Sequence, residues 1–336
     1  MSASAFSAAT SATFAEAEGA ARRRLGFSGY VACFKGIVWR EILRYLHQRE
    51  RFLSALVRPL IWLFIFAAGF RQTLGVSIIP PYETYVLYEE FIAPGLIAMI
   101  LLFNAMQSSL SMVYDRETGT MRTLLVSPFP RSFLLLSKLL GGVSVALLQS
   151  FAFLFVAYWW GIQPPPITEI KLFTFYDPPT WAGGAIEKMT DPIVNSLFSV
   201  PGFIQPFVGY ITVIPAIVLA GLMLGALALF ISSIIKQLEN FAGVMNFVIF
   251  PMFFASSALY PLWRIREASP LLYEICRLNP FTYAVELIRF ALYGQVDTIS
   301  LAAVVGCTVL FLGAAVFAYN PSKGLIARRG GPGGSA

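Results

Sequence analysis

Residues 91–114 read FIAPGLIAMILLFNAMQSSLSMVY, a run of 24 residues without a charged side chain. About 20 apolar residues are enough to carry a helix across the ~30 Å hydrocarbon layer of a bilayer. Four more stretches are free of charge, at 139–166, 192–235, 241–263 and 299–322. Charged residues make up 12% of the 336 residues, about half the usual share in a soluble domain. The sequence therefore predicts an all-α polytopic membrane protein, because the strands of a membrane barrel would alternate in polarity over ~10 residues.

Six transmembrane helices are expected, at about 52–70, 91–113, 133–160, 206–235, 241–262 and 299–319. An even number of spans places both termini on one side of the membrane. If that side is the cytoplasm, seventeen of the 24 Lys and Arg residues lie inside and seven outside, in line with the positive-inside rule. Both termini are therefore predicted to be cytoplasmic. The run 192–235 is long enough for two spans, but Pro192, Pro201 and Pro206 interrupt its first half, which favours one span.

The remaining segments complete the predicted domain organisation. Residues 1–29 form a disordered cytoplasmic tail, with an organelle transit peptide as the alternative. Residues 30–51 form an amphipathic interfacial helix whose basic side meets anionic headgroups, or else a short helix packed on the protein itself. Residues 52–320 form the transmembrane domain, which includes an outer insert at about 161–205, and residues 321–336 form a second cytoplasmic tail.

Mixed charge marks the cytoplasmic connection between the second and third spans. From Asp115 to Pro128 it reads DRETGTMRTLLVSP, in which charges of both signs surround an amphipathic turn with Met121, Leu124 and Leu125. A short helix with an apolar ridge and a charged rim, lying across the cytoplasmic end of a bundle, is suited to docking on another protein. The alternative is a solvated loop anchored by arginines on the inner side.

Apolar segments too short to cross a bilayer precede the last span and are interrupted at Asn279 and Pro280. Non-helical backbone at membrane depth is tolerated where it is buried in protein or lines a wet cavity, so residues 263–294 are predicted to form a re-entrant hairpin that enters from outside. Glu286 and Arg289 lie three residues apart on one helical face and can pair. The alternative is a surface hairpin with no role in transport. We expect the hairpin to act as a gate at the outer end of a path. The gate residues are Asn279, Pro280, Tyr283, Glu286 and Arg289.

Polar side chains recur at helical spacing within the second span, at Asn104, Gln107, Ser108 and Ser111. Such a stripe usually forms hydrogen bonds to neighbouring helices, at about 0.6 kcal/mol each. The alternative is that it lines a translocation path. In the fourth span, a GxxxG pattern at 221–225 allows close contact with another helix.

The sequence carries no pattern for catalysis. It contains no Gly-Lys dipeptide, so the phosphate-binding loop of an ATPase is absent and the chain is not expected to hydrolyse nucleotide. Its single His and three scattered Cys residues argue against a metal site, a disulfide framework or a nucleophilic catalytic group. A stand-alone channel or secondary carrier is the competing function, but no carboxylates pair inside the spans as a proton-coupled carrier would require.

Two stretches resemble one family. The stretch 115–128 is similar to the coupling-helix segment of type 2 ABC exporter (ABC-2) permeases, and LNPFTYAVELIR at 278–289 resembles the pattern of that family before the last span. Phe281 stands where Leu or Met is common in the family, and the insert at 161–205 is longer than the connection typical of small members. Together with the leading amphipathic helix and six spans, the resemblance covers about residues 30–320.

The resemblance implies that this chain is the permease subunit of an ATP-driven exporter. Two permease copies, a homodimer, would each bind a separate ABC ATPase subunit. That subunit would bind ATP and Mg, so no cofactor is expected on this chain. The substrate would be an amphipathic or lipid-linked molecule moved outward from the cytoplasm or inner leaflet of a bacterial inner membrane. Membrane lipid is the other expected partner, and nucleic acid is not expected to bind.

The resemblance also implies roles for particular residues. The ATPase-coupling residues would be Asp115, Arg116, Glu117, Gly119, Thr120, Met121, Arg122, Leu124, Leu125, Ser127 and Pro128. The dimer contact would lie between spans one and five, and the substrate path would follow spans one, two and five. That path would bring substrate close to Asn104, Gln107, Ser108, Ser111 and Asn246.

Overall fold

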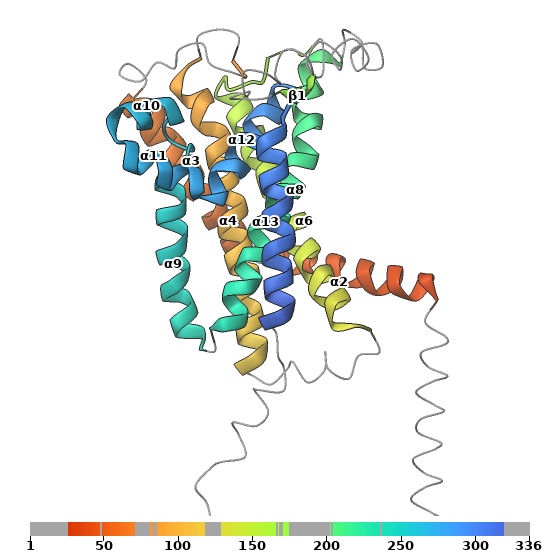
Figure 1. Ribbon diagram of the computed structural model, residues 1–336. Coiled ribbons are helices and arrows are strands. Elements are labelled where there is room, and N and C mark those ends of the chain that lie inside the picture. The colour runs from red at the N-terminus through yellow and green to blue at the C-terminus, as the bar shows by residue number, and fades with distance from the viewer. Residues whose placement is uncertain are drawn as a thin grey trace, which may run out of the picture.

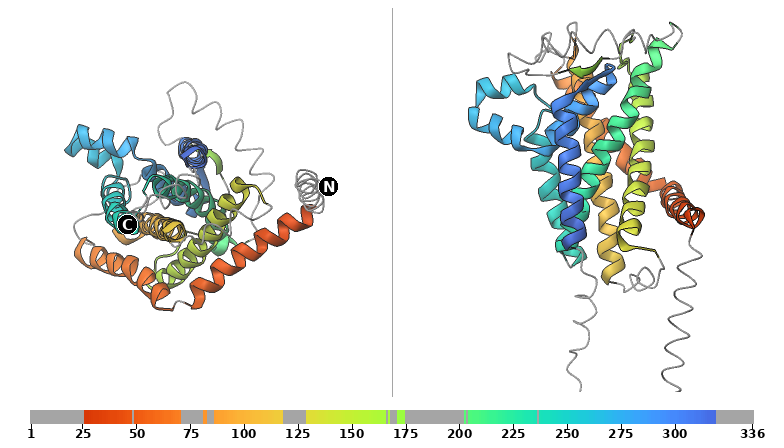
Figure 2. Two further views of the ribbon diagram at one scale, coloured as in Figure 1. Left: turned by 90° about the horizontal axis from the view of Figure 1, so that it is seen from below. Right: turned by 45° about the vertical axis from the view of Figure 1, so that its right-hand side comes forward.

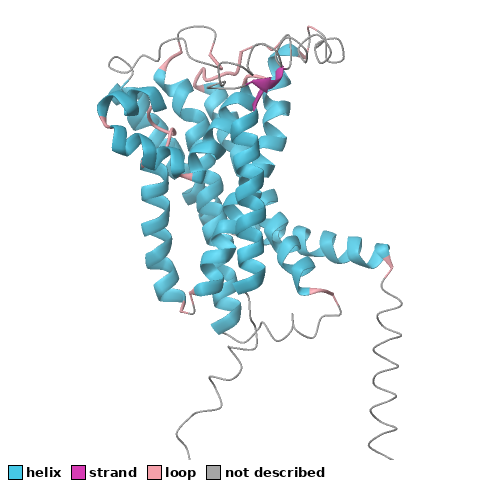
Figure 3. Ribbon diagram, in the orientation of Figure 1, coloured by secondary structure: helices cyan, strands magenta, loops and turns pink. Residues whose placement is uncertain are grey.

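The computed structural model describes residues 26–47, 49–70, 81–82, 86–117, 129–165, 167, 171–174, 202, 204–235 and 237–318. Its helices are α2 (Phe27–His47), α3 (Arg49–Phe70), α4 (Tyr88–Glu117), α6 (Arg131–Trp159), α8 (Gln205–Ile234), α9 (Leu238–Phe254), α10 (Leu262–Ala268), α11 (Pro270–Leu278), α12 (Pro280–Leu292) and α13 (Thr298–Ala318). Two short strands are β1 (Lys171–Thr174) and β2 (Gln295–Asp297). Helices dominate the described residues (Figure 3), as the sequence predicts.

The helix α8 is central to a bundle of upright helices. It packs against α13, α4, α12 and α6, and no charged residue occurs in its 30 residues. The buried core is formed largely by aliphatic and aromatic side chains of α4, α8, α9 and α12. In contrast, α2 lies across the bundle (Figure 1). Seen from below, α2 meets α3 at a corner, and α6 and α4 lie inside that corner (Figure 2).

Each of the six predicted spans falls on a helix, but these helices are not equally suited to cross a bilayer. By length and composition, α4, α6, α8 and α13 are long and apolar enough to do so. The helices α3 and α9 are apolar over the shorter stretches 56–66 and 238–254. The described residues therefore support an all-α polytopic membrane protein with four span candidates, while six spans and cytoplasmic termini stay predictions.

The structure corrects the end of the fifth predicted span, because α9 ends at Phe254 and not at Leu262. Beyond this end, the hydroxyl of Ser256 donates to the carbonyl oxygen of Phe253 at 2.6 Å and accepts from the N–H of Ala258 at 3.2 Å. Such local bonds between side chain and backbone compete with helix hydrogen bonds. The chain therefore leaves the helix before α10 begins.

The helix predicted at residues 30–51 is present as α2, although it ends at His47 and not at Arg51, and its interfacial position stays a prediction. On its apolar side, Phe34, Ile37, Val38 and Ile42 are half-buried and Tyr45 is buried. On the other side, Arg40, Arg44 and His47 are exposed. The helix packs mainly on α6, so it is both amphipathic and attached to the bundle.

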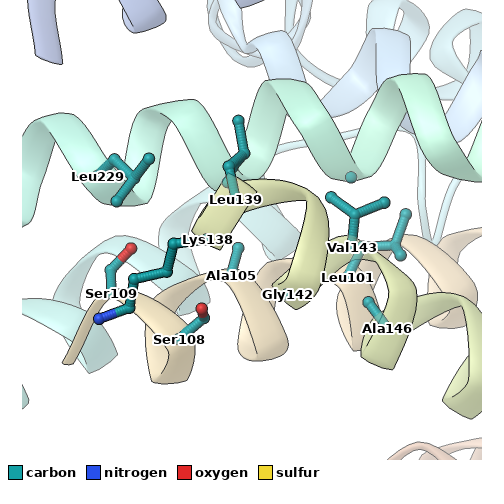
Figure 4. A pocket seen from close by; sticks show the side chains of 12 residues that line it. Leu101, Ala105, Ser108, Ser109, Lys138, Leu139, Gly142, Val143, Ala146 and Leu229 are labelled. Carbon is teal, nitrogen blue, oxygen red and sulfur yellow. The ribbon is translucent and has the colours of Figure 1, made fainter. Parts of the chain in front are cut away.

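The GxxxG pattern of the fourth span lies where α8 contacts α6. A Cβ atom on Gly225 would overlap Leu139 Cδ1, and one on Gly221 would lie 3.2 Å from Val143 Cγ1. Figure 4 shows Leu139 and Val143 on α6 beside α8, next to a cavity of about 20 Å³. The two glycines therefore allow the close contact that the pattern predicted.

The strand β1 belongs to the predicted insert and lies at the end of the bundle that carries α10 and α11 (Figure 1). There β1 pairs in parallel with β2, just before α13. Gly294 precedes β2 with a φ of 68°, which glycine adopts without strain. A Cβ atom on Gly294 would also lie 2.8 Å from Cγ2 of Ile167. Residues 175–201 of the predicted insert at about 161–205 lie outside the described residues.

Candidate functional site

The predicted coupling segment begins on α4. Asp115, Arg116 and Glu117 belong to the last turn of this helix, which extends to the lower end of the bundle (Figure 1). The other predicted coupling residues, from Gly119 to Pro128, lie outside the described residues. A movement of the segment would reach the bundle through α4, which is one continuous helix.

Three aromatic rings pack together where the chain returns to the bundle after the coupling segment. Tyr30 of α2 contacts Phe129 and Phe133 edge-on, with ring centroids 5.2 and 5.1 Å apart. Phe129 and Phe133 lie 5.8 Å from each other at the start of α6. Aromatic pairs contribute about 0.5–1.5 kcal/mol each beyond the burial of their surface. No sequence pattern indicates this contact, because Tyr30 is far from the other two rings along the chain.

The segment of the predicted re-entrant hairpin, residues 263–294, contains α10, the mostly exposed α11 and the almost entirely buried α12. Asn279, at the predicted break, caps α12, because its Oδ1 accepts from the N–H of Phe281 at 3.0 Å. Its Nδ2 donates to the carbonyl oxygens of Met252 and Ala255, both at 2.7 Å. Pro280 follows in the first turn of α12, where a missing N–H costs little. One side-chain amide therefore joins the break in the hairpin to the end of α9.

Glu286 and Arg289 form the ion pair that their spacing predicted. Arg289 Nη1 lies 2.5 Å from Glu286 Oε1, and the two residues are 3% and 8% exposed. Nη2 of Arg289 donates to the carbonyl oxygen of Ser257 at 2.8 Å, and the guanidinium lies 4.1 Å from the ring centroid of Phe91. Arg289 therefore joins α12 to α4 and to the segment after α9. The contacts with Ser257 and Phe91 were not predictable from the spacing of the pair.

Two tyrosines close to this ion pair have uncharged hydroxyl groups. Tyr82 and Tyr293 meet edge-on with ring centroids 5.0 Å apart. Burial raises the pKa of both phenols far above its ordinary value, so both hydroxyls stay neutral. Tyr283, the remaining predicted gate residue, is half-buried and donates to the carbonyl oxygen of Arg277 at 2.8 Å. The predicted gate residues therefore lie on α12 or at its N-terminal cap, and they contact α9, α4 and α11.

The polar stripe of α4 faces α2 and α6. Nδ2 of Asn104 donates to Oε1 of Gln149 on α6 and to the carbonyl oxygen of Ile100 at 3.0 Å. The hydroxyl of Ser111 donates to the carbonyl oxygen of Ser108 at 2.7 Å. The interpretation as hydrogen bonding between helices is therefore confirmed for Asn104.

The stripe also lines a pocket of about 70 Å³ between α2, α4 and α6. Glu41 and Arg44 of α2 contribute to its wall. A second pocket of about 10 Å³ is lined by Asn104 and Gln107 as well, and by Arg58 of α3. No sequence pattern connects α2 or Arg58 with the stripe, because these residues are brought together by packing between helices.

Asn246, the fifth predicted path residue, lies on an exposed face of α9 and lines neither pocket. The other four path residues are together on α4, and their contact with substrate stays a prediction. Among the residues that the structure describes, no group of three or more His, Cys, Asp and Glu side chains could hold a metal ion.

Comparisons with known proteins agree on one family. The family model for the ABC-2 type transporter matches residues 32–176 and 193–293, which include both motif stretches. The chain is 26% identical to the transport permease ycf38 of Cyanophora paradoxa over 259 residues, which cover 76% of this chain and 72% of the relative. It is 24% identical to the inner membrane transport permease YadH of Escherichia coli strain K12 over 285 residues, which cover 84% of this chain and 91% of the relative.

Proposed function

The chain belongs to the ABC-2 type transporter family, and from this premise we propose that it is the permease subunit of an ATP-driven exporter. Its substrate is an amphipathic or lipid-linked molecule, moved outward from the cytoplasm or inner leaflet of a bacterial inner membrane. The observation that carries the proposal is the family match over most of the chain. Relatives named as transport permeases, one of them an inner membrane protein, add support.

In this proposal a separate ABC ATPase subunit binds ATP and Mg and docks on residues 114–131. The charged and apolar turn of this segment has the composition of a docking surface. Its position after the last turn of α4 supports the transfer of motion from the ATPase into the bundle. The contact of Tyr30 with Phe129 and Phe133 would carry the same motion to α2 and α6.

The second partner in this proposal is another copy of the chain. The helices α3 and α9 lie on the same side of the bundle (Figure 2). Each exposes large apolar side chains, such as Phe64 at 56% and Phe247 at 78% exposure. A homodimer across α3 and α9 would cover these side chains. It would also bring Asn246 of each copy toward the partner copy.

The hairpin of α11 and α12 is the proposed outer gate. Asn279 and Arg289 each bind the backbone near the end of α9, through Met252, Ala255 and Ser257. A movement of α9 would therefore be transmitted to the hairpin by these hydrogen bonds. If reversing both charges of the Glu286–Arg289 pair leaves export unchanged, the gate role is wrong.

Reconstitution in liposomes tests the function. The chain is co-purified with an ABC ATPase subunit, and the two are reconstituted together and separately. We expect ATP hydrolysis that depends on the complex, and transport of an amphipathic or lipid-linked cargo when ATP is present. Solute flux through liposomes that hold this chain alone would instead favour a channel or secondary carrier.

A further inference from the structure

We propose that the pocket between α2, α4 and α6, together with the adjoining pocket at α3, binds the phosphate group of an anionic phospholipid headgroup. The lipid comes from the leaflet in which α2 lies. This inference rests on the proposed interfacial position of α2. It does not require that the chain works with an ATPase.

The two pockets form one polar region inside a largely apolar bundle. The larger pocket, of about 70 Å³, exceeds several-fold the ~10–15 Å³ that a single water needs. Asn104 and Gln107 line both pockets. Polar groups are expensive in a membrane protein unless they are paired or face a wet cavity, so this concentration of them is suited to a polar ligand.

The charge of the region is positive. Glu41 is neutralised by two neighbours, because its Oε1 lies 3.1 Å from Arg40 Nη2 and 3.7 Å from Arg44 Nη1. Arg58 adds a further cation beside the smaller pocket, with its guanidinium 4.0 Å from the ring centroid of Phe103. Arginine is well suited to phosphate because its planar fork donates two parallel hydrogen bonds.

One buried hydrogen-bond donor of this region also lacks an acceptor among the described residues. Gln149 is fully buried, and its Oε1 is occupied by the amide of Asn104. Among the described residues its Nε2 has no hydrogen-bond partner, and Gln149 lines the pocket beside Arg58. A buried donor without an acceptor costs free energy, and a phosphate oxygen could supply that acceptor.

The surroundings favour a lipid as the source of the phosphate. Arg44 is exposed at the wall of the larger pocket, so a headgroup could enter beside it. Along the outer side of α2, large apolar side chains such as Trp39 and Leu46 are exposed and could contact acyl chains. Basic pockets between membrane helices on the cytoplasmic side commonly bind anionic headgroups.

The test measures lipid binding to the purified full chain by native mass spectrometry. The probes are phosphatidylglycerol, phosphatidylcholine and inorganic phosphate. Arg44→Gln and Arg58→Gln each remove one cation from the pocket while keeping an amide donor. Both arginines are exposed, so the variants are expected to fold. Lys35→Gln is the matched control, because Lys35 is an exposed cation of α2 that lines neither pocket.

We expect phosphatidylglycerol to bind more tightly than phosphatidylcholine. Each arginine variant should weaken phosphatidylglycerol binding about tenfold, the effect of losing about 1.4 kcal/mol, while Lys35→Gln should bind as the natural chain does. Three results would overturn the proposal: equal binding of both lipids, an equal loss in Lys35→Gln, or competition by inorganic phosphate at the affinity of the lipid. The last result would identify the site as one for a free anion.

Discussion

At the scale of single residues, Asn279 and Arg289 each form contacts with other elements that the sequence motifs do not indicate. Asn279 was predicted as a helix break, and Arg289 as the partner of Glu286. In the structure both also bind backbone carbonyl oxygens of the segment 252–257. A carbonyl oxygen has no sequence signature, because every residue carries one. The local roles were therefore predictable, and the long-range contacts were not.

Substitution of Asn279 separates its capping role from its role as a donor. Asp caps a helix as well as Asn does, but it has no N–H to offer the carbonyl oxygens of Met252 and Ala255. We expect both Asn279→Asp and Asn279→Ala to lower the free energy of unfolding, by about 1–3 kcal/mol for the unsatisfied, partly buried acceptors. Thermal unfolding in detergent measures this. Full stability of Asn279→Asp would show that the cap alone matters.

Arg289 is expected to be the charged residue whose substitution most lowers stability at the end of the bundle that carries α10 and α11. Arg289→Ala leaves the buried carboxylate of Glu286 unpaired, and breaking a buried pair in this way costs about 3–5 kcal/mol. The exchange Glu286→Arg with Arg289→Glu should not restore stability, because the contacts with Ser257 and Phe91 require a cation at position 289. The thermal unfolding temperature is the measurement, with the exposed Arg266→Ala as control. Recovery in the exchanged variant would contradict this account.

At the scale of elements, the sequence predicted most of the helices because charge-free runs and their interruptions mark helix positions in membrane proteins. It placed a helix at each of the six expected spans and at the interfacial segment. It failed at the end of α9, where Ser256 turns the chain before the apolar run is over. It also missed the pairing of β1 with β2, because strands of four and three residues are too short to show a period.

Close packing between helices gives a prediction at two glycines. A Cβ atom on Gly209 of α8 would lie 2.5 Å from the carbonyl oxygen of Leu292, whereas one on Gly306 of α13 would meet nothing within 4 Å. Gly209→Ala should therefore lower stability by about 1–3 kcal/mol through overpacking. Gly306→Ala should leave stability unchanged or raise it by up to about 1 kcal/mol. Unfolding temperatures of the two variants provide the comparison, and equal values would contradict the packing described here.

At the scale of the whole molecule, the predicted coupling segment and the predicted gate lie at opposite ends of the bundle, and α4 extends between them. The helix ends at Glu117 on one side and contacts Arg289 through Phe91 on the other. The family and the position of both motifs were recognisable from the sequence. The two adjoining pockets were not, because their residues come from the four helices α2, α3, α4 and α6, whose packing no local pattern specifies.

If an ABC ATPase drives this chain through residues 114–131, charge reversal at Glu117 should weaken the binding of the ATPase. The control is Glu239→Arg, an equal reversal at the exposed start of α9, which lies at the same end of the bundle (Figure 1). The measurement is the amount of ATPase that co-purifies with each variant. We expect Glu117→Arg to reduce it about tenfold, which corresponds to about 1.4 kcal/mol, and Glu239→Arg to retain it. Retention of the ATPase by Glu117→Arg, or an equal loss in both variants, would contradict the claim.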